Sequence, residues 1–305
     1  DLDLMKGGQS LAGLSASILE KLTPVYREVS PDLILVHGDT TTTLMASLAA
    51  FYCGIEVAHV EAGLRTGNLK SPWPEEANRR LVSTLANLHF APTELAKRNL
   101  LSEGVEEMKI FVTGNTVVDA LRLALGKIES SPAVRKELKS MFSWLSKNRK
   151  IVLVTGHRRE NFGDGFSQIC EAMRELANRF GSVDFVFPVH MNPIVKELVY
   201  SRLGGISNVL LLEPLGYLPF VYLMSKSELL LTDSGGIQEE APSLGKPVLV
   251  MRDTTERPEA LEAGTVLLTG VDKASIVDSV SMLLTDTEMY RKMSRAHNPY
   301  GDGES

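Results

Sequence analysis

Short apolar runs alternate with helix-like segments along most of this chain, and that alternation limits the folds open to it. Apolar runs of strand length occupy residues 33–36, 56–60, 89–91, 109–112, 151–155, 185–188, 209–212, 229–231 and 247–251. Helices are expected at residues 10–29, 40–52, 94–101, 116–126, 166–179 and 218–225, and from residue 75 onward. Such alternation is typical of βα units, so the chain is predicted to be an α/β protein with parallel sheets.

A more polar helical stretch, residues 130–149, interrupts this pattern, which restarts at residue 151. We therefore expect two successive α/β domains, residues 1–145 and residues 146–305. Ligands of open parallel sheets bind at the carboxyl ends of the strands. A ligand-binding cleft between the two domains is accordingly expected.

The composition argues against several classes of protein. The 305 residues carry a net charge of −6, which disfavours a nucleic-acid binder that works through a general basic surface. No apolar run reaches transmembrane length and no signal-peptide pattern is present, so no membrane partner is expected. The two cysteines, Cys53 and Cys170, lack metal-type spacing, which favours a cytoplasmic protein without disulfides.

Polar residues follow several predicted strands, where ligands of parallel sheets bind. Asp39 and Glu61 each follow a strand in the first half, and Glu75 opens the helix after the next loop. His157 and His190 hold similar positions in the second half. Carboxylates facing a histidine suit proton transfer, so these residues are candidates for acid–base catalysis. Structural roles stay open: Asp39 could cap the next helix, and Glu75 could favour a helix dipole.

The run Asp233-Ser234-Gly235-Gly236 joins a short apolar strand to a helix. Glycines let the backbone approach a ligand closely, and free N–H groups at a helix start favour an anion such as phosphate. Glu240, one turn into the helix, could accept hydrogen bonds from two ribose hydroxyls. The alternative is an ordinary strand-to-helix turn with Ser234 as the helix cap.

Metal and cofactor chemistry lack their usual motifs. The histidines show no H-x-x-x-H or H-E-x-x-H spacing, and neither a G-x-x-x-x-G-K-[ST] motif nor a convincing G-x-G-x-x-G motif is present. A nucleophilic serine elbow is also absent. We therefore expect neither a metal nor a cofactor. His59, inside a predicted strand, is expected to be structural.

Six motifs span the chain in order: residues 36–43, 59–67, 72–79, 155–161, 233–240 and 245–259. Together they resemble the non-hydrolysing UDP-N-acetylglucosamine 2-epimerases of bacteria. The resemblance implies two Rossmann-like domains in the glycosyltransferase-B arrangement and a homodimer. It also implies reversible inversion at C2 of UDP-GlcNAc to give UDP-ManNAc for surface polysaccharides. In this family UDP is eliminated to leave 2-acetamidoglucal and is then added back.

Matching the motifs residue by residue assigns the site. Asp39, Glu61 and Glu75 match the catalytic carboxylates, and His157 matches a histidine near the leaving group. The matched substrate-binding residues are Leu215, Phe220, Ser234, Gly235, Gly236, Glu240 and Arg257. Many bacterial members need a second UDP-GlcNAc beside the active site, and its candidate residues here are Arg158, Arg159, Glu160 and His190. These four residues could equally serve the catalytic site or the local fold.

The sequence departs from the family at both ends. It lacks the opening strand and the Gly-Thr-Arg-Pro-Glu motif, and it stops before the final helix of its relatives. We therefore expect the 305-residue chain by itself to be poorly stable and nearly inactive, because central strands would be missing. Three alternative functions stay open: a hydrolysing 2-epimerase, a glycosyltransferase of the same fold, and an inactive nucleotide-sugar-binding protein.

Overall fold

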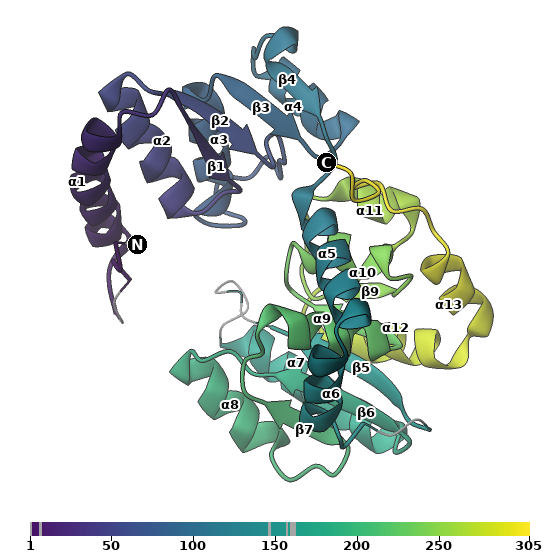
Figure 1. The fold of residues 1–305 in the computed structure, drawn as a ribbon. Helices are drawn as coiled ribbons and strands as arrows, with labels where there is room; N and C mark the ends of the chain where they lie inside the picture. The colour runs from purple at the N-terminus through teal and green to yellow at the C-terminus, as the bar shows by residue number, and fades with distance from the viewer. Residues whose placement is uncertain (1, 6–7, 146–147, 157, 159–162) are drawn as a thin grey trace. The chain divides into compact units, whose positions relative to one another are not determined.

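A computed structural model describes residues 2–5, 8–145, 148–156, 158 and 163–305. It is an α/β structure with two parallel sheets, which confirms the predicted fold class. The chain divides into two compact units: unit 1 holds residues 1–116 and 304–305, and unit 2 holds residues 117–303. In Figure 1 the main part of unit 1 runs from purple to blue, and unit 2 runs from teal to yellow.

Unit 1 contains a four-stranded parallel sheet in the order β1–β2–β3–β4. The strands are β1 (Leu33–His37), β2 (Glu56–Val60), β3 (Leu88–Ala91) and β4 (Ile110–Val112). The helices are α1 (Leu11–Val29), α2 (Thr41–Cys53), α3 (Glu75–Leu85) and α4 (Glu94–Ser102), with a short 3₁₀ helix, η1 (Glu107–Lys109). Apolar side chains of α1, α2 and α3 pack against β1 and β2, whereas α4 packs against β3 and β4.

Hydroxyl caps set the starts of the first two helices. Ser10 Oγ accepts a hydrogen bond from Gly13 N at 3.1 Å, and Thr40 Oγ1 accepts one from Thr43 N at 3.3 Å. The alternative in which Asp39 caps α2 is therefore wrong, because Thr40 is the cap. The Asp39 carboxylate is left to bond elsewhere.

Unit 2 contains a six-stranded parallel sheet in the order β10–β9–β8–β5–β6–β7. The strands are β5 (Lys150–Thr155), β6 (Val183–Pro188), β7 (Val209–Leu212), β8 (Leu229–Thr232), β9 (Val248–Val250) and β10 (Val266–Leu268). The helices are α5 (Thr116–Ser130), α6 (Pro132–Met141), α7 (Asp164–Arg179), α8 (Pro193–Leu203), α9 (Tyr217–Lys226), α10 (Ile237–Ser243), α11 (Pro258–Ala263), α12 (Lys273–Thr285) and α13 (Thr287–Ser294). Strand β10 was not among the predicted strands.

The second sheet is buried on both faces. Leu229 and Leu231 of β8 join one apolar cluster, whereas Leu230 joins the other. Successive residues of a strand point to opposite faces, so a sheet covered on both sides needs apolar residues at every position. That requirement explains why these strands were visible as unbroken apolar runs in the sequence.

Helices α5 and α6 pack with unit 2. Val118 and Leu121 of α5 and Leu138 of α6 lie in the same apolar cluster as strands β5 and β8. The division between the units therefore falls at Thr116 and Val117, earlier than the boundary at residues 145–146 that the sequence suggested. Residues 130–149 interrupted the predicted pattern because most of their side chains are polar, yet apolar side chains of α5 and α6 pack on the second sheet.

The described residues were examined for membrane-spanning helices, metal-binding groups and disulfides. None of the helices among them has both the length and the apolar character needed to cross a bilayer. No group of three or more His, Cys, Asp or Glu side chains among them could hold a metal ion. Cys53 and Cys170 are both free thiols.

Candidate active site

Three segments of unit 1 meet at the carboxyl edge of its sheet. Gly38, after β1, donates its N–H to Val60 O of β2 at 3.0 Å, and a Cβ atom added to Gly38 would lie 3.7 Å from Glu61 Oε1. Asn78 of α3 donates its side-chain amide to Asp39 O at 2.8 Å. The fold therefore brings together the segments that carry Asp39, Glu61 and the first turn of α3.

Asp39 is held by a buried arginine. Arg79 Nη2 donates to Asp39 Oδ2 at 2.7 Å, and the Asp39 side chain keeps 23% of its surface exposed while that of Arg79 keeps 2%. A charge-assisted hydrogen bond of this length restricts the orientation of the carboxylate. Asp39 is thus both positioned and reachable from solvent.

Glu61 has an unusual backbone conformation. Its φ angle is 66°, in the left-handed region that non-glycine residues rarely adopt and that costs about 1–3 kcal/mol. Asn115, which follows β4, donates its side-chain amide to Glu61 Oε2 at 2.9 Å. Such conformations cluster at functional sites, where the surrounding structure maintains them. The conformation of Glu61 therefore fits a placed functional carboxylate better than a loop residue.

Glu75 has a carboxylate oxygen that lacks a protein donor. Its Oε2 is buried, and no hydrogen-bond donor to it is found among the described residues. Burying a polar atom without a partner is costly, so such an atom is suited to a donor on a bound ligand. A role limited to the helix dipole would not require this burial.

His59 is a structural histidine, as its place inside a strand suggested. It is fully buried, and its Nε2 lies 2.8 Å from Gly38 O. Burial lowers the pKa of His59 from 6.5 to about 4, so the imidazole is neutral at pH 7 and donates Nε2–H to the carbonyl. It supports the turn that precedes Asp39.

The buried neutral His59 makes unit 1 sensitive to acid. At pH 5 the unfolded chain binds a proton at this histidine and the folded chain does not, so acidification favours unfolding. Stability is lost as the pH falls from about 6.5 to about 4. At pH 5 the free energy of unfolding is lower by about 2 kcal/mol than at neutral pH because of this histidine. We expect His59→Gln to remove this part of the pH dependence in urea unfolding at pH 7 and pH 5.

A matched control is His37→Gln, because His37 is exposed on the neighbouring strand β1. The control should lose as much stability between pH 7 and pH 5 as the unmodified protein. An equal acid loss in the His59 variant and the unmodified protein would show that His59 is not the group responsible.

In unit 2 the strand order reverses beside β5. The chain runs from β5 to β6 and β7 on one side and then returns with β8 on the other side of β5. The carboxyl ends of β5 and β8 form a topological switch point, where open α/β sheets bind ligands. Thr155 Oγ1 and Thr232 Oγ1 lie 2.6 Å apart and join these two strand ends.

The predicted phosphate-binding turn begins at this switch point. Ser234 N donates to Thr232 Oγ1 at 3.0 Å, and Asp233 Oδ2 accepts a hydrogen bond from Arg158 N at 2.9 Å. The N-cap of α10 is Gly236, with no side-chain cap bond, so the alternative in which Ser234 is the cap is wrong. The turn therefore connects the ends of both strands at the switch point.

Gly235 cannot carry a side chain in this structure. A Cβ atom there would lie 2.6 Å from Arg257 Nη1 and 2.9 Å from Glu256 Oε1. Arg257 cannot easily move away, because its guanidinium donates to Glu239 and to Glu256 and is buried. Gly235 thus allows Arg257 to approach the backbone of the turn closely.

Glu240 is paired with a residue for which the sequence gave no signal. Tyr217, in the first turn of α9, donates its hydroxyl to Glu240 Oε1 at 2.7 Å. Burial raises the pKa of Glu240, and the hydrogen bond from Tyr217 opposes that effect. The hydroxyl of Tyr217 therefore fixes the orientation of the Glu240 carboxyl group.

The other predicted residues of unit 2 lie in several places. Leu215 and Phe220 are partly buried and pack against the apolar cluster beneath α9. His190 is exposed, and its Nδ1 accepts a hydrogen bond from Asn192 N at 3.1 Å. Arg158 reaches the turn through its backbone, as described above. His157, Arg159 and Glu160 lie outside the described residues.

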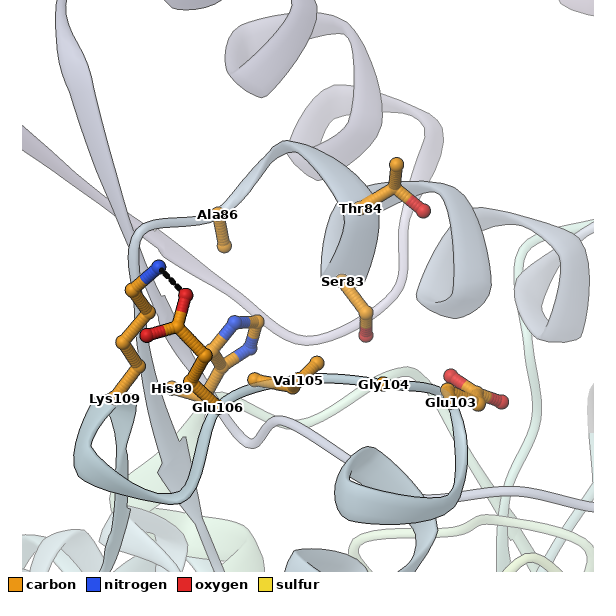
Figure 2. Close-up of a pocket in the computed structure, with 9 residues that line it drawn as sticks. All are labelled: Ser83, Thr84, Ala86, His89, Glu103, Gly104, Val105, Glu106 and Lys109. Carbon is orange, nitrogen blue, oxygen red and sulfur yellow. Dashed lines mark hydrogen bonds and ion pairs between the residues drawn. The ribbon is translucent and has the colours of Figure 1, made fainter.

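A cavity of about 280 Å³ lies elsewhere in unit 1, at the amino ends of β3 and β4. Figure 2 shows the ion pair of Glu106 and Lys109 on one side of it and Ser83 and Thr84 of α3 on the other. Burial lowers the pKa of His89, which also lines it, to about 4. None of the predicted site residues lines this cavity, so it is separate from the candidate site.

Sequence reasoning assigned no role to several residues that hold the candidate site together. Asn115 follows a strand just as Asp39 and Glu61 do, so the same rule could have identified it. Arg79 lies one turn after Glu75 on the same helix, so the sequence placed both side chains on one helix face. That spacing did not indicate which carboxylate Arg79 would contact. Tyr217 carried no comparable signal.

Comparison with known proteins supplies independent findings. A family model described as UDP-N-acetylglucosamine 2-epimerase matches residues 1–305. The chain is 60% identical over 303 residues to the UDP-N-acetylglucosamine 2-epimerase of Yersinia pestis, covering 99% of this chain and 81% of that protein. It is also similar to the crystal structure of UDP-GlcNAc 2-epimerase from Neisseria meningitidis bound to UDP-GlcNAc, with a TM-score of 0.97, 54% identity and coverage of 99% and 81%. The Methanocaldococcus jannaschii enzyme in complex with UDP-GlcNAc and UDP gives a TM-score of 0.86, 36% identity and coverage of 98% and 80%.

Proposed function

Because this chain belongs to the UDP-N-acetylglucosamine 2-epimerase family, we propose that it interconverts UDP-GlcNAc and UDP-ManNAc without net hydrolysis. The observation that carries the proposal is the convergence of the segments bearing Asp39, Glu61 and Glu75 at one sheet edge. The buried Oε2 of Glu75, for which the described residues supply no donor, adds to it, because that atom is suited to a substrate donor. Acid–base chemistry at a sugar carbon needs carboxylates placed in this way.

The chemistry requires an elimination. The C2 proton of the GlcNAc unit is not acidic enough for simple removal and return. An anti elimination instead breaks the C2–H bond and the bond from C1 to the diphosphate oxygen, which leaves UDP and the C1=C2 bond of 2-acetamidoglucal. Addition of UDP at C1, with a proton delivered to the opposite face of C2, gives the epimer. Positioned carboxylates can serve as the base in one step and the acid in the other.

We assign nucleotide binding to unit 2. The turn at Ser234, Gly235 and Gly236 lies at the topological switch point, where the backbone N–H groups of a glycine turn can stabilise the charge of the departing diphosphate. Glu240 would accept the ribose hydroxyls, and Arg257, close to Gly235, would lie near the phosphates. The leaving-group role of His157, the second nucleotide site, the homodimer and the cytoplasmic location stay predictions.

A single experiment in heavy water distinguishes the alternatives. The protein is incubated with UDP-GlcNAc and no acceptor, and the products are followed by NMR. We expect both epimers with deuterium at C2 and only traces of free UDP. Sustained release of UDP with free ManNAc would instead indicate a hydrolysing 2-epimerase. Absence of exchange at C2 would favour a glycosyltransferase or an inactive binding protein.

A further inference from the structure

Arg79 connects two carboxylates inside unit 1. Its side chain is almost completely buried, and its Nη2 and Nη1 donate to Asp39 Oδ2 at 2.7 Å and to Glu76 Oε2 at 2.9 Å. Glu76 has no exposed surface at all. The planar guanidinium of arginine holds its donors in a fixed fork, so it fixes the direction of one carboxylate relative to the other.

Glu76 is anchored on the loop that precedes α3. Its Oε2 accepts a hydrogen bond from Thr66 N at 3.0 Å, and its Oε1 accepts one from Gly67 N at 3.1 Å. A continuous series of hydrogen bonds therefore runs from the backbone at residues 66–67 through Glu76 and Arg79 to Asp39. The far end of this series is the carboxylate to which the proposed function assigns proton transfer.

Stability alone is a weak explanation for this arrangement. A buried ion pair often contributes little net stability, because removing two charges from water offsets their mutual attraction. Apolar side chains of similar size could fill the same space without that cost. The charged groups instead orient the Asp39 carboxylate, because the Arg79 guanidinium that contacts it is also held by Glu76.

We infer that Arg79, oriented by Glu76, is a positioning residue that holds Asp39 in the geometry needed for proton transfer at the sugar. The inference rests on the proposed function. A misplaced catalytic group can cost about 100-fold in rate even when the change lies outside the chemistry. The effect should therefore fall on kcat, because Arg79 acts through Asp39 and its own side chain is almost completely buried.

The test compares the Arg79→Gln and Arg79→Lys variants of the protein with an Arg65→Gln variant. Arg65 is a matched control: its side chain is only 9% exposed, and it donates to Glu103 at 2.7 Å and to Ser83 Oγ at 2.8 Å. None of its hydrogen bonds among the described residues reaches Asp39, Glu61 or Glu75. We expect Arg79→Gln to lower kcat about 100-fold while KM for UDP-GlcNAc changes less than about threefold. Lysine keeps the charge but not the fork, so Arg79→Lys should recover part of kcat.

A double-mutant cycle separates positioning from damage to the fold. If Arg79 acts through Asp39, adding Arg79→Gln to Asp39→Asn should lower kcat less than about twofold further. Arg65→Gln should lower the unfolding midpoint by about as much as Arg79→Gln does. It should nevertheless change kcat less than about threefold. Should Arg79→Gln not fold, Arg79→Lys and Glu76→Gln carry the same comparison.

Three results would overturn the inference: an equal loss of kcat in the Arg65 variant, an effect of the Arg79 variants on KM alone, or full multiplicative losses in the cycle. Failure of the proposed function would give a different result: the unmodified protein itself would not exchange the C2 proton.

Discussion

Replacement of Glu75 by glutamine is expected to lower kcat for the interconversion of UDP-GlcNAc and UDP-ManNAc about 1000-fold. Glu75 opens α3, and its Oε2 is buried without a donor among the described residues. Glutamine keeps the shape of the side chain but can neither take up nor release a proton. The loss should appear equally in epimer formation and in deuterium exchange at C2, with KM changed only a few-fold.

Glu107→Gln provides the matched control for this substitution. Glu107 lies in η1 on the surface and pairs with Lys97 at 2.8 Å, so removing its charge should leave kcat within about twofold. A Glu75→Gln variant that kept more than about a tenth of kcat would show that this carboxylate does not transfer the proton. Glu75 would then be assigned to substrate orientation.

Replacement of Gly235 by alanine is expected to lower kcat/KM about 100-fold, mainly through weaker binding of UDP-GlcNAc. The added methyl group would lie 2.6 Å from Arg257 Nη1, whose guanidinium is held by buried carboxylates. Either the turn or the Arg257 network must shift, and both belong to the proposed diphosphate site. The same overpacking should lower the free energy of unfolding by about 1–3 kcal/mol.

Two glycines serve as controls for this prediction. Gly236 has helical backbone angles, and the nearest atom to an added Cβ is 4.0 Å away, so Gly236→Ala should leave stability almost unchanged. Gly126 lies in α5 with nothing within 4 Å, so Gly126→Ala should leave kcat/KM unchanged. Calorimetric titration measures the affinity of each variant for UDP, and thermal unfolding measures its stability. Unchanged affinity for UDP in the Gly235 variant would contradict the assignment of this turn to the diphosphate.

The positions of the strands and of the residues that follow them could be predicted from the sequence. Buried parallel strands require apolar residues on both faces, so runs such as residues 229–231 stand out from polar surroundings. Because all strands of such a sheet point the same way, residues that follow them collect at one edge. That rule selects Asp39 and Glu61 as candidates, because they follow β1 and β2.

The partners of these residues could not be predicted in the same way. Arg79 contacts Asp39 across 40 positions of sequence, and Tyr217 contacts Glu240 across 23. No local propensity or periodicity encodes such pairings, because they depend on where whole helices dock. For a similar reason the sequence did not show that α5 and α6 pack with the second sheet, since their apolar stripes contact that sheet only in the folded chain.

By itself, the sequence determined the fold class, the order of the βα units and the polar residues that end the strands, because hydrophobic periodicity and turn chemistry act over short distances. Only the tertiary structure decided that Thr40 caps α2, that Arg79 connects Asp39 to Glu76, and that Gly235 must lack a side chain beside Arg257. These features arise from close packing between distant segments, where fractions of an ångström decide which groups meet.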